Sequence, residues 1–334
     1  MEFHTKMTDL LHVRYPIMLG GIKGLGRAPL AAAVSNAGGF GVITAGCFSN
    51  CADPVEALRD EIRHTRELTD KPFGVNISMN PGAGSDYGPL TNGFVEVVCQ
   101  EGIPAVETSG RSPDGIVGRL HDNGVKVIHK VASARFARKA EQAGVDAVAC
   151  IGYESGGHSG LDQVSGHIVL QRTLSMVHVP VLCAASVVDG PGLLSALALG
   201  AEDVTIGTRF ICSQESPAHP KMKEWIVAHN ETDTMLVQRS IRNPIRAIKN
   251  DMAYRVLGYE TMAGQPKISE IMPLINGQRS DEAMAAGDIE NCLFSCGQGM
   301  GLIQDIPTIA EIVEEMIRTA GESYLRLQSM LSGT

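Results

Sequence analysis

The sequence of 334 residues has few aromatic residues, no long apolar run and no excess of basic side chains. Aromatic residues make up 4% of the chain, which disfavours a stacking surface for nucleic-acid bases. Lys and Arg number 28 against 37 Asp and Glu, so the charge also disfavours binding to a phosphate backbone. We therefore expect no nucleic-acid partner. No apolar stretch reaches the length of about 18 residues that a membrane span needs.

Targeting and metal signals are also missing. The first residues, MEFHTKMTDLLHVRYP, carry charges throughout and have no apolar core of a signal peptide. The eight cysteines include two pairs spaced four apart, Cys47 with Cys51 and Cys292 with Cys296, but neither pair has CxxC spacing or a neighbouring His. We predict free thiols, no metal site and a cytoplasmic location.

What the chain does contain is a repeated strand-then-helix pattern. Hydrophobic residues make up 44% and charged residues 19%, an ordinary globular balance. Short apolar runs, several of them rich in β-branched residues, alternate with longer stretches of helical character. The runs cover residues 15–20, 40–45, 73–78, 105–108, 125–130, 146–151, 180–185 and 203–207. Eight such units predict an α/β fold, the (β/α)8 TIM barrel.

The pattern changes after residue 210. We assign residues 1–210 to the barrel, 211–290 to an inserted helical lid or small domain, and 291–334 to a C-terminal segment whose helix returns to the barrel. Within the insertion, Arg239, Arg242 and Arg246 have the spacing of one helical face, although Pro244 can break that helix. The arginines indicate either a solvated basic stripe or a site for a dinucleotide phosphate or an acidic carrier protein.

In TIM barrels the functional site lies at the carboxyl ends of the strands. Polar or glycine-rich groups stand there at Gly20–Gly21, Asn76, His129–Lys130, Ala184–Ser186 and Gly207–Arg209. The loops after the last two strands of such barrels commonly bind phosphate, so these positions indicate either a phosphate site or ordinary tight turns. Because side chains alternate along a strand, only one of His129 and Lys130 faces the site; we favour Lys130, near a bound anion or in a salt bridge.

The loop at 152–160 reads GYESGGHSG, in which four of nine residues are Gly. Bare backbone there would let a flat ligand approach closely. His158 projects from this loop and has the ordinary pKa range of a general acid or base, although an exposed His in a glycine-rich turn is the alternative. The spacing at 21–26 is wrong for a dinucleotide-binding GxGxxG motif, and Walker A, HExxH and GxSxG motifs are absent.

These segments resemble the nitronate monooxygenase family of FMN-dependent TIM barrels, also called the 2-nitropropane dioxygenase family. The similar segments are PIMLGGIKGLGRAPLAAAVSNAGGFGVITAG, KPFGVNIS, GVKVIHKV, GYESGGHSG, the DG at 189–190, LGAEDVTIGTRF and SCGQGMGLI, and they span nearly the whole chain. The family also includes NADH:quinone reductases and FMN-dependent enoyl-ACP reductases. The segment QRSIRNPIRAIKN looks closer to those two branches than to fungal-type nitronate oxidases.

The resemblance implies a role for each matching residue. His158 would be the catalytic acid/base. The remaining matches would bind FMN: Gly20 and Gly21 beneath the ring, Asn76 and Lys130 at its polar edge or ribityl chain, Glu154, Gly156 and Gly157 in the loop over it, Ala185, Ser186, Gly207 and Thr208 at the phosphate, and Ser295, Gly297 and Gln298 closing over the ring.

Two positions depart from the family pattern. Leu19 stands where many members have Gln, and Ala185–Ser186 replaces a usual Gly-Gly. Because residues with a Cβ rarely adopt positive φ, we expect that loop to sit differently.

Three functions follow as hypotheses. The first is oxidation of alkyl nitronates by O2 through bound FMN. The second is reduction of a quinone or an enoyl-ACP thioester by NADH or NADPH at the same flavin. The third is a barrel without catalysis that serves as a binding protein. The expected partners are a small-molecule substrate, O2 or a quinone as acceptor, and a second copy in a homodimer.

Overall fold

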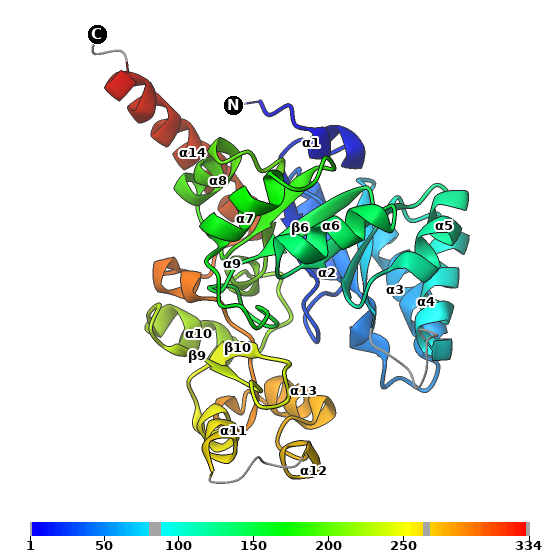
Figure 1. Ribbon diagram of the computed structural model, residues 1–334, viewed down its shortest axis with the longest axis vertical. Coiled ribbons are helices and arrows are strands. Elements are labelled where there is room, and N and C mark those ends of the chain that lie inside the picture. Colours follow the sequence, from blue (N-terminus) through cyan, green and yellow to red (C-terminus); the bar gives the residue numbers. More distant parts are fainter. Residues whose placement is uncertain (1, 80–87, 263–267, 332–334) are drawn as a thin grey trace.

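The predicted strands form the central sheet of the protein. The computed structural model describes residues 2–79, 88–262 and 268–331 (Figure 1). All eight predicted strands are present, with ends that differ by a few residues from the sequence prediction. They are β1 (Ile17–Leu19), β2 (Gly41–Thr44), β3 (Phe73–Met79), β4 (Ala105–Gly110), β5 (Lys126–Val131), β6 (Ala147–Ile151), β7 (Val181–Ala184) and β8 (Asp203–Ile206).

The strands close into a barrel. Their order is β1-β8-β7-β6-β5-β4-β3-β2, and each neighbouring pair is parallel. Between β1 and β2, the backbone N–H of Leu19 donates to Phe40 O at 2.9 Å and that of Phe40 donates to Ile17 O at 2.8 Å. These bonds complete the ring, so the predicted (β/α)8 TIM barrel is confirmed.

Helices connect the strands on the outside of the barrel. They are α1 (Lys6–Leu11) before β1, then α2 (Ala28–Asn36), α3 (Pro54–Leu68), α4 (Gly88–Gln100), α5 (Asp114–Asp122), α6 (Ala134–Gln142), α7 (Gly166–Leu174) and α8 (Gly190–Ala198). Their starts are set by capping side chains: Asp53, Ser133 and Asp189 each accept a hydrogen bond from a backbone N–H in the first turn. The turn after α8 needs a positive φ, which Gly200 supplies at 104°.

The C-terminal helix α14 (Ile309–Leu331) packs against α8 and α2. Its contacts come from the first half of the helix, where Ile312, Met316 and Ala320 are buried. Figure 1 shows the second half extending away from the body, and Leu325 and Leu331 are exposed there.

Residues 211–290 contain a β-hairpin that the sequence analysis missed. Strands β9 (Thr234–Val237) and β10 (Ile245–Ile248) pair antiparallel where a helix through the arginines was predicted. Pro244 lacks the N–H a helix interior needs, and Gln238 and Arg242 turn the chain with φ of 64° and 59°. The other elements here are α9 (Thr208–Ile211), α10 (Pro220–Ala228), α11 (Asp251–Thr261), α12 (Ile268–Ile271) and α13 (Gly277–Ala285), and the short 3₁₀ helices of the chain are η1 (Ala45–Phe48), η2 (Ile289–Asn291) and η3 (Gln298–Leu302).

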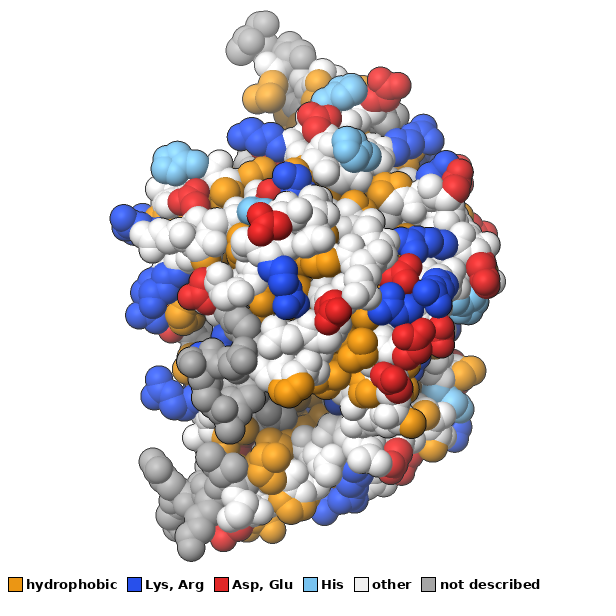
Figure 2. All heavy atoms as spheres, turned by 90° about the vertical axis from the view of Figure 1, so that its right-hand side faces the viewer, with side chains coloured by type: hydrophobic (Ala, Val, Ile, Leu, Met, Phe, Trp, Pro, Cys, Tyr) orange, Lys and Arg blue, Asp and Glu red, His pale blue; other side chains and the backbone are white. Residues whose placement is uncertain are grey.

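The surface does not present one large patch of a single charge on the face drawn in Figure 2. Acidic and basic side chains lie beside one another there, with hydrophobic side chains between them. Within the described residues, no helix is both long and apolar enough to cross a membrane.

Candidate functional site at the barrel mouth

A buried carboxylate joins three of the predicted site residues. Glu107 on β4 accepts hydrogen bonds at Oε2 from the backbone N–H of Gly21 at 2.8 Å and from Nδ2 of Asn76 at 2.7 Å. Its Oε1 lies 3.1 Å from Nζ of Lys130. The sheet register explains the meeting, because Asn76 stands opposite Glu107 and Lys130 lies two residues beyond Glu107's other partner, Ile128.

The chain after β1 approaches this cluster closely. A Cβ added to Gly21 would lie 2.2 Å from Cγ of Asn76, and one added to Gly20 would lie 2.9 Å from Cγ2 of Thr205. Both distances are too short for a side chain, so the tight approach of Gly20 and Gly21 to the barrel interior requires glycine at Gly21 and favours it at Gly20.

His129 and Lys130 take opposite sides of β5, as the alternation of side chains predicts. The imidazole Nδ1 of His129 lies 2.8 Å from Oγ1 of Thr108, and the residue is buried. Burial lowers the pKa of His129 to about 4, so this ring is neutral at physiological pH. Lys130, with 15% of its side chain exposed, is the residue of the pair that faces the mouth.

The glycine-rich loop after β6 carries His158 at the surface of the mouth. The residue is exposed, yet the atoms crowded around its ring lower the pKa of His158, and the positive charge of Lys130 lowers it further. A lowered pKa favours the neutral imidazole, the form that can accept a proton. The predicted acid/base thus lies near enough to Lys130 to sense its charge.

The hairpin holds this loop in place. Gly157 and Arg246 pair as an antiparallel bridge, with hydrogen bonds of 3.0 and 2.7 Å between their backbones. The Arg246 guanidinium donates to Tyr153 O at 3.0 Å and lies 4.4 Å from the centre of the Tyr153 ring. Arg246 is only 2% exposed, so the predicted stripe of three arginines on one helical face is wrong; Arg239 and Arg242 alone are exposed, in the hairpin turn.

The segment at 295–298 lies between the loops after β6 and β8. The N–H of Gly297 donates to Oγ1 of Thr208 at 3.0 Å, and that of Gln298 donates to Glu154 O at 2.8 Å. Ser295 forms an antiparallel bridge with Ala247 of β10. The structure therefore brings together predicted site residues from three distant parts of the chain.

Glycines in these segments serve packing as well as ligand approach. A Cβ on Gly156 would lie 2.8 Å from the backbone of Cys296, and one on Gly297 would lie 2.5 Å from Oγ of Ser186. These two glycines let the segments touch each other, whereas the sequence argument gave them to a flat ligand. Gly207 differs, since nothing lies closer than 4.0 Å to its added Cβ. Its backbone is open to a ligand.

The loop after β7 keeps a glycine-like conformation without glycine. Ser186 has φ of 59°, in the left-handed region, and its Oγ accepts a hydrogen bond of 2.9 Å from the N–H of Gly299. This bond helps hold a conformation that costs a Cβ-bearing residue of the order of 1 kcal/mol. Ser186 thus holds the left-handed conformation that a glycine would adopt without this cost.

A cleft of about 200 Å³ lies beside this loop, lined among others by Glu154, Ala185, Ser186 and Asp189. Both carboxylate oxygens of Glu154 accept from the N–H of Gly166 at 2.9 and 3.0 Å, which caps the start of α7. Glu154 thus supports the loop from below. Leu19, the departure from the family pattern, is fully buried.

Two polar residues of the site escaped the sequence analysis. Glu107 interrupts an apolar strand run, the same signal that selected Asn76 and Lys130, and it could have been found that way. Thr44 accepts from the N–H of Ile22 at 2.9 Å, and its side chain would lie 2.3 Å from a Cβ on Gly26. A lone Thr at a strand end carries no comparable signal.

Among the cysteines, Cys183 lines the cleft beside the loop after β7. All eight are free, and burial raises the pKa of Cys150 to about 12 and that of Cys183 to about 11. Across the residues that the structure describes, no group of three or more His, Cys, Asp or Glu side chains could hold a metal ion.

Comparison with known proteins assigns the family. The model of a family described as nitronate monooxygenase matches residues 4–319. The chain belongs to the nitronate monooxygenase family. This confirms the resemblance drawn from the sequence. The family consists of FMN-dependent oxidoreductases, and the chain is an enzyme of that class.

Individual relatives agree over nearly the full chain. A protein from Staphylococcus saprophyticus called probable nitronate monooxygenase is 31% identical, over 96% of this chain and 99% of its own length. FabK from Thermotoga maritima superimposes with a TM-score of 0.88 and 35% identity, covering 98% of this chain and 99% of that one. A nitroalkane oxidase from Streptomyces ansochromogenes, at 24% identity and a TM-score of 0.80, covers 96% of this chain and 99% of that one and shares the fold.

Proposed function

We propose that this member of the nitronate monooxygenase family binds FMN at the barrel mouth and oxidises alkyl nitronates, with O2 as the final acceptor. The observation that carries the proposal is the arrangement at the mouth. Three groups stand at the ends of neighbouring strands. Lys130 and the amide of Asn76 both contact the buried carboxylate of Glu107. The third group is the imidazole of His158, whose pKa is lowered by the atoms crowded around its ring and by the charge of Lys130.

The residues present fit FMN. Asn76 donates both hydrogen bonds of its Nδ2 to Glu107, at 2.7 and 3.3 Å, which leaves its Oδ1 to accept from a ring N–H. Lys130 supplies a cation for the ring's carbonyl edge, and the open backbone at Gly207 can approach a phosphate. FMN, when bound, supplies the two-electron redox chemistry that no side chain here can provide.

The chain's own residues then bind the substrate and manage protons. The positive charge of Lys130 favours an anionic nitronate over neutral competitors. The neutral imidazole of His158 can accept the proton of a nitroalkane and hold it, so that the substrate is presented as its nitronate. The loop that carries His158 is fixed by Arg246 and Gly157, which limits its motion during this transfer.

An anaerobic stopped-flow experiment tests this function. The FMN-loaded protein is mixed with an alkyl nitronate, NADH or NADPH, and the flavin absorbance is followed. Rapid bleaching by the nitronate, and recovery on admission of O2, is the expected result. An unchanged flavin spectrum with the nitronate would rule the function out.

A second candidate is reduction of a quinone or an enoyl-ACP thioester by NADH or NADPH. Arg239 and Arg242, exposed in the hairpin turn, favour it because they could pair with phosphate or carboxylate groups. In the same experiment this activity predicts rapid bleaching by NADH or NADPH. It also predicts that Arg239→Ala with Arg242→Ala raises the KM for the nucleotide or carrier substrate while leaving nitronate oxidation alone.

A further inference from the structure

Glu107 contacts Gly21, Asn76 and Lys130 together. Its side chain is fully buried, and the three partners come from the segment after β1, from β3 and from β5. Each of them is a proposed FMN-binding residue. A change at Glu107 therefore reaches three points of the site, although the carboxylate itself is closed off from the mouth.

The charge of Glu107 is balanced mainly by Lys130. Its Oε2 is satisfied by two N–H donors, whereas Oε1 lies 3.1 Å from the Lys130 ammonium and has no hydrogen-bond partner among the described residues. A buried carboxylate without a cation is unfavourable by several kcal/mol, so the two groups form one coupled pair. The net charge of the pair is zero. The carboxylate of Glu107 therefore weakens the positive electrostatic potential that Lys130 produces at the mouth.

Lys130 is also the member of the pair that reaches toward a ligand. Its Nζ lies 3.5 Å from the position of a Cβ on Gly20, at the strand end where the mouth begins. A positive charge near a flavin stabilises the electron-rich reduced form, and a negative charge behind it weakens that effect. The strength of the Lys130–Glu107 pair thus enters the redox balance of any flavin held there.

We infer that Glu107 is a positioning residue that orients Asn76 and Lys130 toward FMN and lowers the reduction potential of the bound flavin by offsetting the charge of Lys130. The inference rests on FMN binding at the mouth, as proposed above. It assigns two separable roles to one side chain. The geometric role needs a carboxylate or amide of the right length, and the electrostatic role needs the negative charge.

Two substitutions separate these roles. Glu107→Gln keeps the length and loses the charge, so FMN remains bound and the ratio of reduced to oxidised flavin at a fixed potential rises about tenfold, a shift of about 30 mV. Glu107→Asp keeps the charge but draws it back from its partners, so the Kd for FMN rises about tenfold, while the potential rises by less than in Glu107→Gln. Lys130→Met shifts the potential in the direction opposite to Glu107→Gln.

The measurements are the midpoint potential of the FMN-loaded protein and FMN binding by fluorescence titration. The matched control is Glu101→Gln, the same change at a glutamate held by arginines at the other end of the barrel, which should leave both quantities unchanged. If the ratio of reduced to oxidised flavin in Glu107→Gln stays within twofold of the wild-type ratio at the same potential, the electrostatic role is overturned. Wild-type FMN affinity in Glu107→Asp overturns the geometric role.

A further measurement covers variants that lose FMN. In the apoprotein, Glu107→Gln leaves Lys130 without its counter-charge, and adding Lys130→Met removes that imbalance. The double variant should therefore melt at a higher temperature than Glu107→Gln alone, and a lower melting temperature would contradict the coupling. If the wild-type chain itself bound no FMN, the proposed function would fail, whereas FMN binding with unshifted variants would defeat only this inference.

Discussion

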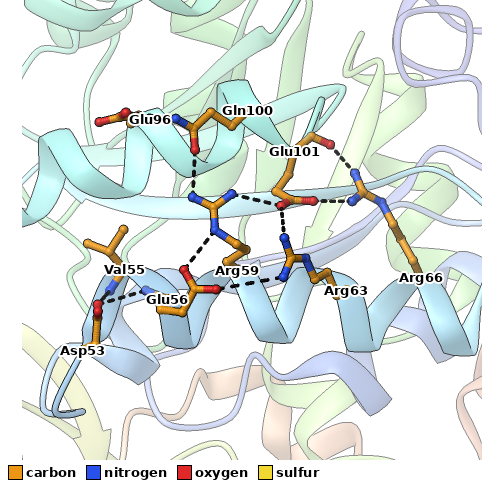
Figure 3. A network of polar contacts seen from close by, with 9 residues as sticks. All are labelled: Asp53, Val55, Glu56, Arg59, Arg63, Arg66, Glu96, Gln100 and Glu101. Carbon is orange, nitrogen blue, oxygen red and sulfur yellow. Dashed lines mark hydrogen bonds and ion pairs between the residues drawn. The ribbon is translucent and has the colours of Figure 1, made fainter.

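Glu101 and Glu107 lie on either side of the start of β4, yet the two glutamates are bound in opposite ways. Glu101 follows α4 below the start of β4, and Arg59, Arg63 and Arg66 of α3 converge on it (Figure 3). Glu107 lies inside the barrel with a single lysine and two N–H donors. The first cluster is spread over a partly exposed surface, and the second is fully enclosed.

The difference illustrates how this barrel divides its charged groups. At the lower end, several cations share one acid and water still reaches them, so each pair contributes little and losing one is tolerated. At the mouth, one cation and one acid depend on each other, so losing either leaves a charge without a partner. In TIM barrels the lower end supports stability and the mouth carries function. Substitutions matched between the two ends test that division here.

The largest effect is expected at His158. His158→Ala should lower turnover of a nitroalkane at least 100-fold, because general acid–base catalysis contributes about that much or more. FMN content and thermal stability should stay unchanged, since the side chain is exposed. Steady-state kinetics and flavin absorbance check both points.

The matched control lies at the opposite end of the barrel. His121 pairs with Asp146 at 2.8 Å there, and His121→Ala should leave turnover within twofold of the wild type. Equal turnover in the two variants would show that His158 is not the acid/base and that the ends of the barrel do not differ as described.

The next effect concerns the close approach of backbone at the mouth. Gly21→Ala places a Cβ 2.2 Å from Cγ of Asn76, so Asn76 must move off Glu107. We expect a loss of about 1–3 kcal/mol in the free energy of unfolding and at least tenfold weaker FMN binding. Urea unfolding and fluorescence titration measure the two effects.

Gly118→Ala in α5 is the control for that change. An added Cβ at Gly118 meets nothing within 4 Å, and alanine favours a helix interior, so stability should rise by about 0.5–1 kcal/mol. A stable, FMN-binding Gly21→Ala variant would mean that the cluster around Glu107 tolerates displacement.

Sequence reasoning found the barrel because parallel strands buried on both faces leave continuous apolar runs. It found Asn76 and Lys130 because polar residues stand out in such runs. Glu107 is also a polar residue in an apolar run, but its contacts with Asn76 and Lys130 follow from the register of strands β3, β4 and β5. Pairing across strands is a property of the folded sheet and has no local signature in the chain.

The β-hairpin and the backbone conformation of Ser186 could not be predicted from the local sequence, for different reasons. The spacing of Arg239, Arg242 and Arg246 fits a helix, but the hairpin of Thr234–Val237 and Ile245–Ile248 prevailed because it buries Val237, Ile245 and Ile248. Ser186 holds a φ of 59° that its residue type disfavours, supported by a hydrogen bond from a residue far along the chain. Tertiary contacts decided both, and neither can be read from neighbouring residues.

The smallest effect is expected at the lower end of the barrel. Burial alone would raise the pKa of Glu101, but hydrogen bonds from Arg59 and Arg66 outweigh it, and the pKa is lowered overall. A lowered pKa in the folded state means that Glu101 stabilises the fold above its unfolded pKa of about 4.3 and loses this contribution as the pH falls through its folded pKa. Glu101→Gln should therefore cost about 1 kcal/mol of stability at pH 7, less at high salt, and converge with the wild type in acid.

Urea unfolding of Glu101→Gln at pH 7 and in acid, with and without added salt, measures this contribution, and turnover should not change. The result also bears on the mouth. Arg63 and Arg66 keep 56% and 43% of their side chains exposed, so after the substitution water still solvates them. The side chain of Lys130 is only 15% exposed, so water solvates its ammonium much less when Glu107 is replaced by Gln. If Glu101→Gln reduced stability as much as Glu107→Gln, burial would not be what separates the two glutamates, and the number of bound cations would have to explain their difference instead.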